Sequence, residues 1–180
     1  MKIYDDKHIK NIVLLGGTKS GKTTLAETML FEAGLINRRG RVEDKNTVSD
    51  WHEIEHDRGN SVYASAMHTE WRDYKINIID TPGLDDFIGE IVPSIRVADT
   101  CVMLLNAQHG VEVGTELVWN WVKRYDKPVI LAVNQLDHGN ANWEDTIASA
   151  KASFGSAATI MQYPVNPGEG FNLSLIHISE

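Results

Sequence analysis

Cysteine is almost missing from this sequence, with Cys101 as its single example in 180 residues. A lone cysteine cannot form an intramolecular disulfide, so a small scaffold held together by disulfides is excluded. Cys101 stands in the apolar run 101–105, where we expect a reduced thiol buried in a core rather than a reactive one. The fold must therefore depend on an ordinary hydrophobic core, for which one domain of this length is sufficient.

Long hydrophobic runs are also missing. No apolar stretch approaches the roughly 20 residues needed to cross a bilayer, and the charged segment 1–10 lacks the apolar centre of a secretory signal. Basic residues are few, 17 against 25 acidic ones, which gives a formal net charge of −8. We therefore expect a cytoplasmic, monomeric protein without membrane or DNA as partner, and any contact with RNA must be local.

Short apolar runs alternate with segments of helical spacing along the chain. The runs that indicate strands are 12–15, 61–70, 74–79, 101–105, 129–133 and 159–163. The segments that indicate helices start at Lys22, near residue 117 and near residue 143. This order predicts an α/β fold, a doubly wound and mostly parallel sheet with helices on both faces, which the strand 159–163 joins. The polar segment 37–60 has no stable period and is expected to be a long mobile loop.

The strongest motif lies between the first predicted strand and the first predicted helix. Residues 16–23 fit G-x-x-x-x-G-K-[ST], which predicts the phosphate loop of a P-loop NTPase fold. In such a loop, backbone amides and the positive helix end hold phosphates, Lys22 reaches the β- and γ-phosphate oxygens, and the Thr23 hydroxyl binds Mg²⁺. The predicted nucleotide contacts are Gly16, Gly17, Thr18, Lys19, Ser20, Gly21, Lys22, Thr23 and Thr24. The alternative is a glycine-rich turn without a ligand.

Two further motifs follow predicted strands. Asp80-Thr-Pro-Gly83 comes directly after 74–79, where Asp80 can bind a water of Mg²⁺ and the Gly83 amide can approach a γ-phosphate. Asn134-Gln-Leu-Asp137 comes directly after 129–133, where the Asp137 carboxylate can accept the N1 and N2 hydrogens of guanine. Adenine lacks that pair of donors, so the expected ligands are GTP and GDP with Mg²⁺. The alternative for Asp137 is a cap of its own loop.

These motifs, in this order, resemble those of the translational GTPases, most closely the GTP-binding domain of elongation factor G, over 11–171. Arg58-Gly-Asn-Ser-Val62 resembles the first switch, Arg-Gly-Ile-Thr-Ile, which implies that Ser61 stands for the threonine that binds Mg²⁺. Residues 80–87 resemble the second switch, Asp-Thr-Pro-Gly-His-Val-Asp-Phe. The resemblance implies a GTPase whose full-length parent acts on the ribosome during translocation of tRNA and mRNA.

Leu84 stands where the family has the histidine that orients the attacking water. Leucine can neither donate nor accept a hydrogen bond, and losing such a group typically costs on the order of 10² to 10⁴ in rate. Two readings stay open: a GTPase triggered by the ribosome, and a GTP-dependent switch that binds the ribosome with little or no hydrolysis. The catalytic positions implied are Lys22, Gly83 and Leu84.

Two further departures from the family pattern concern the nucleotide itself. Lys19 replaces an aspartate of the phosphate loop; it either places a second positive charge near the β–γ bridge, which would make it catalytic, or is a solvated surface lysine. Gln135 replaces the lysine of Asn-Lys-x-Asp, whose stem covers the base. We expect somewhat weaker binding of guanine, with specificity kept by Asp137.

The resemblance also bears on the domain limits. We expect residues 1–172 to form one GTP-binding domain that is incomplete at its carboxyl end, because the family's Ser-Ala-Leu motif behind the guanine has no match. Residues 173–180 are expected to be a non-native tail, because 174–180 resembles a translated sequencing adaptor.

Two rival functions share part of this pattern. His52-Glu-Ile-Glu-His56 fits the H-E-x-x-H pattern of zinc proteases, which needs a helix facing a cleft and a further ligand. Its place in the polar segment 37–60 favours a charged part of the first switch. An ATP-using kinase or ATPase would share the phosphate loop but is disfavoured by residues 134–137 and by both switch motifs.

Overall fold

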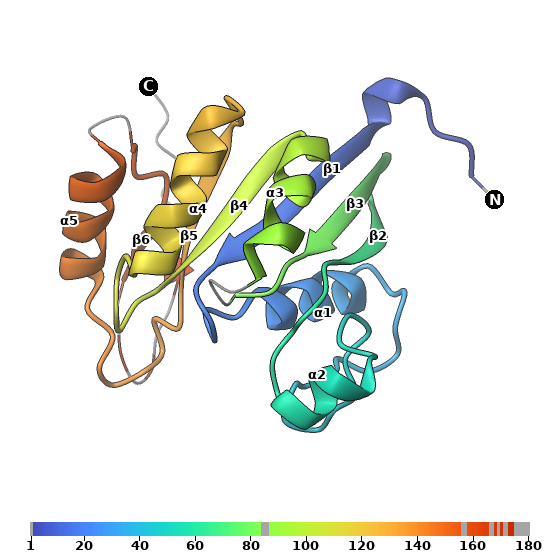
Figure 1. The fold of residues 1–180 in the computed structure, drawn as a ribbon, viewed down its shortest axis with the longest axis horizontal. Coiled ribbons are helices and arrows are strands. Elements are labelled where there is room, and N and C mark those ends of the chain that lie inside the picture. The colour runs from blue at the N-terminus through green and yellow to red at the C-terminus, as the bar shows by residue number, and fades with distance from the viewer. Residues whose placement is uncertain are drawn as a thin grey trace.

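The computed structural model describes residues 2–83, 87–155, 158–165, 168, 170 and 173–174. Its centre is a five-stranded sheet in the order β2-β3-β1-β4-β5 (Figure 1). The strands are β1 (Ile9–Gly16), β2 (Ser65–Trp71), β3 (Tyr74–Asp80), β4 (Thr100–Asn106) and β5 (Val129–Asn134). All neighbours are parallel except the pair β2 and β3. The predicted mixed α/β fold with a mostly parallel sheet is confirmed.

Helices cover both faces of this sheet. One face is covered by α1 (Lys22–Glu32), and the other by α3 (Ile88–Val97), α4 (Val113–Arg124) and α5 (Trp143–Phe154). The short helix α2 (Glu53–Arg58) contributes no residue to either core, and a 3₁₀ turn, η1 (Asp6–His8), precedes β1. None of the helices in the described ranges combines the length and the apolarity needed to cross a bilayer.

The two cores follow from the alternation of side chains along β1. Val13 and Leu15 point to the face covered by α3, α4 and α5, where the larger core also contains the buried Cys101. Leu14 points to the opposite face and packs against Ala26 of α1. Because β1 is central and apolar on both faces, its carboxyl end is fixed on both sides. The loop that follows it, residues 16–23, therefore starts from a rigid base.

Two predictions of secondary structure in the first-switch region need correction. The segment 37–60 is not one loop, because it contains α2. The strand expected to begin at residue 61 begins at Ser65, because the amides of Val62 and Tyr63 bond to the Glu55 side chain instead of a neighbouring strand.

The predicted strand 159–163 does not join the central sheet. Only β6 (Tyr163–Pro164) forms there, and it pairs with β7 (Leu173–Ser174) in a separate two-stranded sheet. Met161, in the middle of the predicted strand, is 76% exposed. Sheet formation at 159–163 would thus bury little apolar surface, and Pro164 has no amide hydrogen to extend a ladder.

Candidate functional site

The loop 16–23, called the phosphate loop after its predicted ligand, connects β1 to α1. Lys22 is 6% exposed, and its ammonium donates hydrogen bonds to the carbonyls of Gly16 at 3.0 Å and Gly17 at 2.8 Å. Burial lowers the pKa of Lys22 to about 8, against the opposing effect of the Asp80 carboxylate. The side chain therefore curls back over the loop, and its charge is concentrated at the carboxyl edge of the sheet.

The carbonyls of the phosphate loop are bound from the side of residues 134 and 135. Asn134 Nδ2 donates to the carbonyl of Ser20 at 2.9 Å, and Gln135 Nε2 donates to that of Lys19 at 2.8 Å. Gly21, the next residue of the loop, has φ 97°, and a Cβ there would lie 2.2 Å from Asn134 Nδ2. Only glycine fits this close approach. The predicted base motif and the predicted phosphate loop thus form one hydrogen-bonded unit.

Oxygen atoms from three predicted motifs meet beside Lys22. Thr23 Oγ1 donates to Asp80 Oδ2 at 2.7 Å and lies 3.3 Å from Ser61 Oγ. Asp80 is 2% exposed, and its other oxygen, Oδ1, is buried without a hydrogen-bond partner among the described residues. Burial raises the pKa of Asp80 to about 6, although the Thr23 hydroxyl and the Lys22 charge act in the opposite direction. An unpaired buried carboxylate oxygen beside two hydroxyls fits the oxygen ligands that Mg²⁺ prefers.

Asp50 is a buried carboxylate at this place that the sequence analysis missed. It is 5% exposed, and its Oδ2 is buried without a hydrogen-bond partner in the described part of the chain. Burial raises the pKa of Asp50, and the Ser61 hydroxyl acts in the opposite direction. Its charge also acts on Lys22 and Asp80. In the sequence it is one acidic residue among several in a polar segment, so no local pattern distinguishes it.

Two buried glutamates hold the segment that carries Ser61. Glu55 of α2, 2% exposed, accepts hydrogen bonds from the amides of Val62 at 2.9 Å and Tyr63 at 3.1 Å. Glu27 of α1, fully buried, accepts one from the amide of Gly40 at 2.9 Å. Backbone amides so satisfied cannot move without leaving a buried carboxylate unpaired. Both glutamates are positioning residues that sequence analysis did not identify.

Gly83 packs directly against the phosphate loop. A Cβ at Gly83 would lie 2.6 Å from Lys22 Nζ and 2.8 Å from the carbonyl of Gly17. The next position, Leu84, lies outside the described residues. Thr81, the residue after Asp80, donates from its hydroxyl to the carbonyl of Leu14 at 2.7 Å and so ties this turn to β1.

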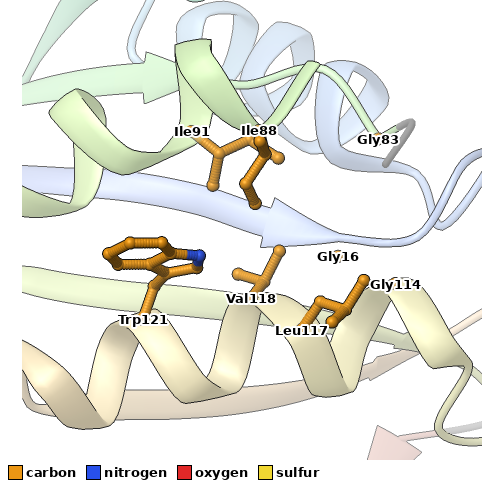
Figure 2. Close-up of a pocket in the computed structure, with 8 residues that line it drawn as sticks. All are labelled: Gly16, Gly83, Ile88, Ile91, Gly114, Leu117, Val118 and Trp121. Carbon is orange, nitrogen blue, oxygen red and sulfur yellow. The ribbon is translucent and has the colours of Figure 1, made fainter. Parts of the chain in front are cut away.

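An apolar cavity lies beside this turn, between α3 and α4. Its volume is about 250 Å³. Figure 2 shows its wall, formed by Gly16, Gly83, Ile88, Ile91, Gly114, Leu117, Val118 and Trp121. Because this lining carries hardly any polar groups, it is not the place for a triphosphate, and the phosphate loop meets it only through Gly16.

The remaining predicted contacts lie at the surface. Lys19, Thr24 and Asp137 are exposed, and Thr18 is half-buried. Lys19 adopts a left-handed backbone conformation with φ 60°. In the described part of the chain no hydrogen bond reaches the Asp137 carboxylate. The alternative interpretation of Asp137, a cap of its own loop, is therefore not supported by a hydrogen bond there.

The histidines of the H-E-x-x-H pattern make contacts within their own segment. The ring of His52 stacks on Trp51 with centroids 3.7 Å apart. His56 Nε2 lies 2.7 Å from the carbonyl of Asp50. The helix α2 runs from Glu53 to Arg58, so His52 precedes it as the N-cap, whereas the protease pattern places both histidines on one face of a helix.

Comparisons with known proteins agree with this arrangement. A family model described as the elongation factor Tu GTP binding domain matches residues 7–177. Elongation factor G of Mycoplasma genitalium is 37% identical over 171 residues, covering 95% of this chain and 25% of that protein. Elongation factor G 2 of Streptomyces coelicolor is 36% identical over 163 residues, covering 91% and 24%.

A solved structure is similar as well. A crystal structure of a protein from Thermus thermophilus has a TM-score of 0.86 and 29% identity, covering 91% of this chain and 24% of that one. The chain thus spans about a quarter of the length of the relatives it matches.

Proposed function

The chain belongs to the family of elongation factor Tu GTP-binding domains, and from that premise we propose that it binds Mg²⁺-GTP and hydrolyses it to GDP. In a longer protein similar to elongation factor G, this reaction would take place on the ribosome, in the cytoplasm, during translocation. The protein would act there as a monomer. The observation that carries the proposal is the convergence of Thr23, Ser61 and Asp80 beside the ammonium of Lys22.

The phosphates would lie along the loop 16–23, whose outward carbonyls are already bonded. Asn134 and Gln135 hold the carbonyls of Ser20 and Lys19. The amide of Ser20 donates to the carbonyl of Gly17 at 3.3 Å, and the other amides of the loop would bind the phosphates. The Lys22 ammonium would exchange its contacts with loop carbonyls for phosphate oxygens. The amide of Gly83 would approach the γ-phosphate, and Lys19 would supply a second positive charge near the bridge.

The magnesium site would use the hydroxyls of Thr23 and Ser61, with Asp80 acting through a bound water. The unpaired Oδ1 of Asp80 supports this assignment. Bound Mg²⁺ would supply positive charge between the β- and γ-phosphates. Guanine would lie over Asn134 and Gln135, with the Asp137 carboxylate accepting from N1 and N2.

A second candidate function follows from Leu84. A leucine cannot orient a water, so the protein would then be a GTP-dependent switch that binds the ribosome with little or no hydrolysis. The deciding experiment is single-turnover GTP hydrolysis by the full-length protein, with and without ribosomes, comparing the natural Leu84 with Leu84→His. Ribosome-stimulated hydrolysis by the natural protein supports the GTPase. Binding of GTP with hydrolysis only in Leu84→His supports the switch.

The domain limits are a separate proposal. Residues 1–172 would form one GTP-binding domain, incomplete at its carboxyl end, and the tail 173–180 would add to it no more than the pairing of the two-residue strand β7 with β6. A truncation after residue 172 should leave the GTP dissociation constant within about twofold of the longer chain. A larger increase in the dissociation constant would show that residues 173–180 belong to the domain.

A further inference from the structure

The side chain of Gln135 connects two loops through both ends of its amide. Its Nε2 donates to the carbonyl of Lys19 at 2.8 Å. Its Oε1 accepts from Asn106 Nδ2 at 2.7 Å and from Gln108 Nε2 at 3.2 Å. Gln135 itself has φ 61°, so the chain turns sharply at the end of β5 to aim this side chain along the phosphate loop.

The orientation of the amide follows from its neighbours. Asn106 is 7% exposed, and its Oδ1 accepts from the amide of Gln108 at 2.8 Å. Its Nδ2 must therefore face Gln135, which fixes Oε1 as the acceptor and turns Nε2 toward Lys19. The network consists of neutral amides only, and each group in it meets a complementary partner.

We propose that Gln135 is a positioning residue that holds the phosphate loop in its anion-binding conformation, and that Asn106 and Gln108 make glutamine the required residue at this position. The inference rests on the proposed nucleotide function. Gln135 holds the carbonyl of Lys19, and the amide of the same peptide unit, that of Ser20, donates to the carbonyl of Gly17 at 3.3 Å within the loop. The turn from which the other loop amides would reach the phosphates is thereby kept in place. This reverses the expectation from the sequence, in which glutamine is a weaker substitute for the lysine of Asn-Lys-x-Asp.

A lysine at position 135 would meet the wrong partners. Its ammonium has donors only, and Asn106 Nδ2 and Gln108 Nε2 would also point donors at it. Rotating the side-chain amide of Asn106 would offer the lysine an oxygen. The Asn106 Nδ2 donor would then face the backbone N–H of Gln108, which is also a donor. A carboxylate at position 106 resolves the conflict, because it accepts from both.

The test measures the dissociation constant of fluorescent GDP, together with the melting midpoint, for four variants of the chain. Gln135→Met keeps a stem of similar length but has no amide. Gln135→Lys introduces the mismatch, and Asn106→Asp with Gln135→Lys repairs it. Gln162→Lys makes the same charge change on an exposed glutamine and serves as the control.

We expect Gln135→Met and Gln135→Lys to weaken GDP binding about tenfold, the effect of one lost hydrogen bond and unpaired buried groups. The double variant should return to within about threefold of the natural chain, and Gln162→Lys should bind as the natural chain does. The inference is overturned if Gln135→Met binds GDP as tightly as the natural chain. The role of Gln135 would then be to cover the base with its aliphatic stem. The inference is also overturned if Gln135→Lys binds as tightly as the natural chain, or if the double variant binds no better than Gln135→Lys.

Failure of the proposed function and failure of this inference give different binding results. If the natural chain binds no GDP, the proposed function fails and this inference fails with it. If the natural chain binds GDP and Gln135→Met binds equally well, only the inference fails. Should Gln135→Lys melt below the temperature of the assay, Gln135→Met and the double variant remain decisive.

Discussion

The carboxylate of Glu55 accepts a hydrogen bond from the amide of Val62 at 2.9 Å, across seven residues of the same segment. This contact lies one residue after Ser61, whose hydroxyl is 3.3 Å from Thr23 Oγ1. A single buried side chain thus connects a surface helix, α2, to the predicted magnesium site. The position of Ser61 depends on Glu55 rather than on a strand.

Replacement of Glu55 by alanine should therefore weaken GTP binding in the presence of Mg²⁺. The amides of Val62 and Tyr63 would lose their acceptor, which typically costs about 1–3 kcal/mol of stability, and Ser61 would no longer be held beside Thr23. We expect about a tenfold higher dissociation constant for GTP, measured with a fluorescent analogue. Glu53→Ala, on the exposed side of the same helix, is the control and should change neither quantity. Equal dissociation constants for GTP in Glu55→Ala and Glu53→Ala would show that Glu55 does not position Ser61.

Thr23→Ala should make GTP binding nearly independent of Mg²⁺. The Thr23 hydroxyl donates to Asp80 Oδ2 at 2.7 Å. Its loss would remove one of the proposed oxygen ligands of Mg²⁺ and would leave the buried Asp80 without this donor. The measurement is a titration of fluorescent GTP with and without EDTA. In the natural chain, removal of the metal should weaken binding about tenfold or more. Thr28→Ala, one turn later on α1, is the control and should keep the full response to EDTA. A full response in Thr23→Ala would contradict the assignment.

The parts of the site that could be predicted are those whose chemistry is local in the sequence. The phosphate loop and Asp80 follow this rule, because each role needs one residue type at one place after a buried strand. Asp50 and Glu55 do not, because their burial is created by contacts between the first-switch segment and distant elements. The role of Gln135 also depends on a partner, Asn106, that is 29 residues away in the chain.

The same reason explains what was missed in the fold. No helix was predicted at α3, and Pro93 inside it argues against one. Ile91 and Ile95 are nevertheless buried in the larger core, and the apolar surface that they bury outweighs the local preference. The strands β1 and β4, by contrast, were predictable because their apolar runs are buried on both faces.

Gly83→Ala should abolish tight GTP binding, while Gly89→Ala should not. The added methyl group at position 83 would lie 2.6 Å from Lys22 Nζ and 2.8 Å from the carbonyl of Gly17, whereas position 89 has nothing within 4 Å. Gly89 is the second residue of α3, so alanine there should stabilise the fold slightly, by less than the roughly 0.5–1 kcal/mol typical of a helix interior. Fluorescent GTP titration and thermal unfolding measure the two effects. Unchanged GTP affinity in Gly83→Ala would mean that this turn moves away from Lys22 in solution.

Cys101 should react slowly with thiol reagents as long as the fold is intact. Its side chain, on β4, is fully buried in the larger core, and burial raises the pKa of the Cys101 thiol to about 11. Near pH 8, only about one thiol in a thousand would then be the reactive thiolate. The rate of reaction with an aromatic disulfide reagent should rise steeply in denaturant, and in the folded chain it should rise about tenfold from pH 8 to pH 9, as the thiolate fraction does. Rapid labelling of the folded chain at pH 8 would show that this part of the core opens readily.

Asp137→Asn should exchange guanine for xanthine as the preferred base. A carboxylate offers acceptors to both N1 and N2 of guanine, whereas an asparagine offers one acceptor and one donor, which matches N1–H and the C2 carbonyl of xanthine. We expect the dissociation constant for GDP to rise by about a hundredfold or more and that for XDP to fall, since mispaired polar groups discriminate strongly. Asp126→Asn, in the turn after α4, makes the same change away from the site and should leave both constants unaltered. An Asp137→Asn variant that still prefers GDP would take base recognition away from this carboxylate, although the phosphate and magnesium contacts would stand.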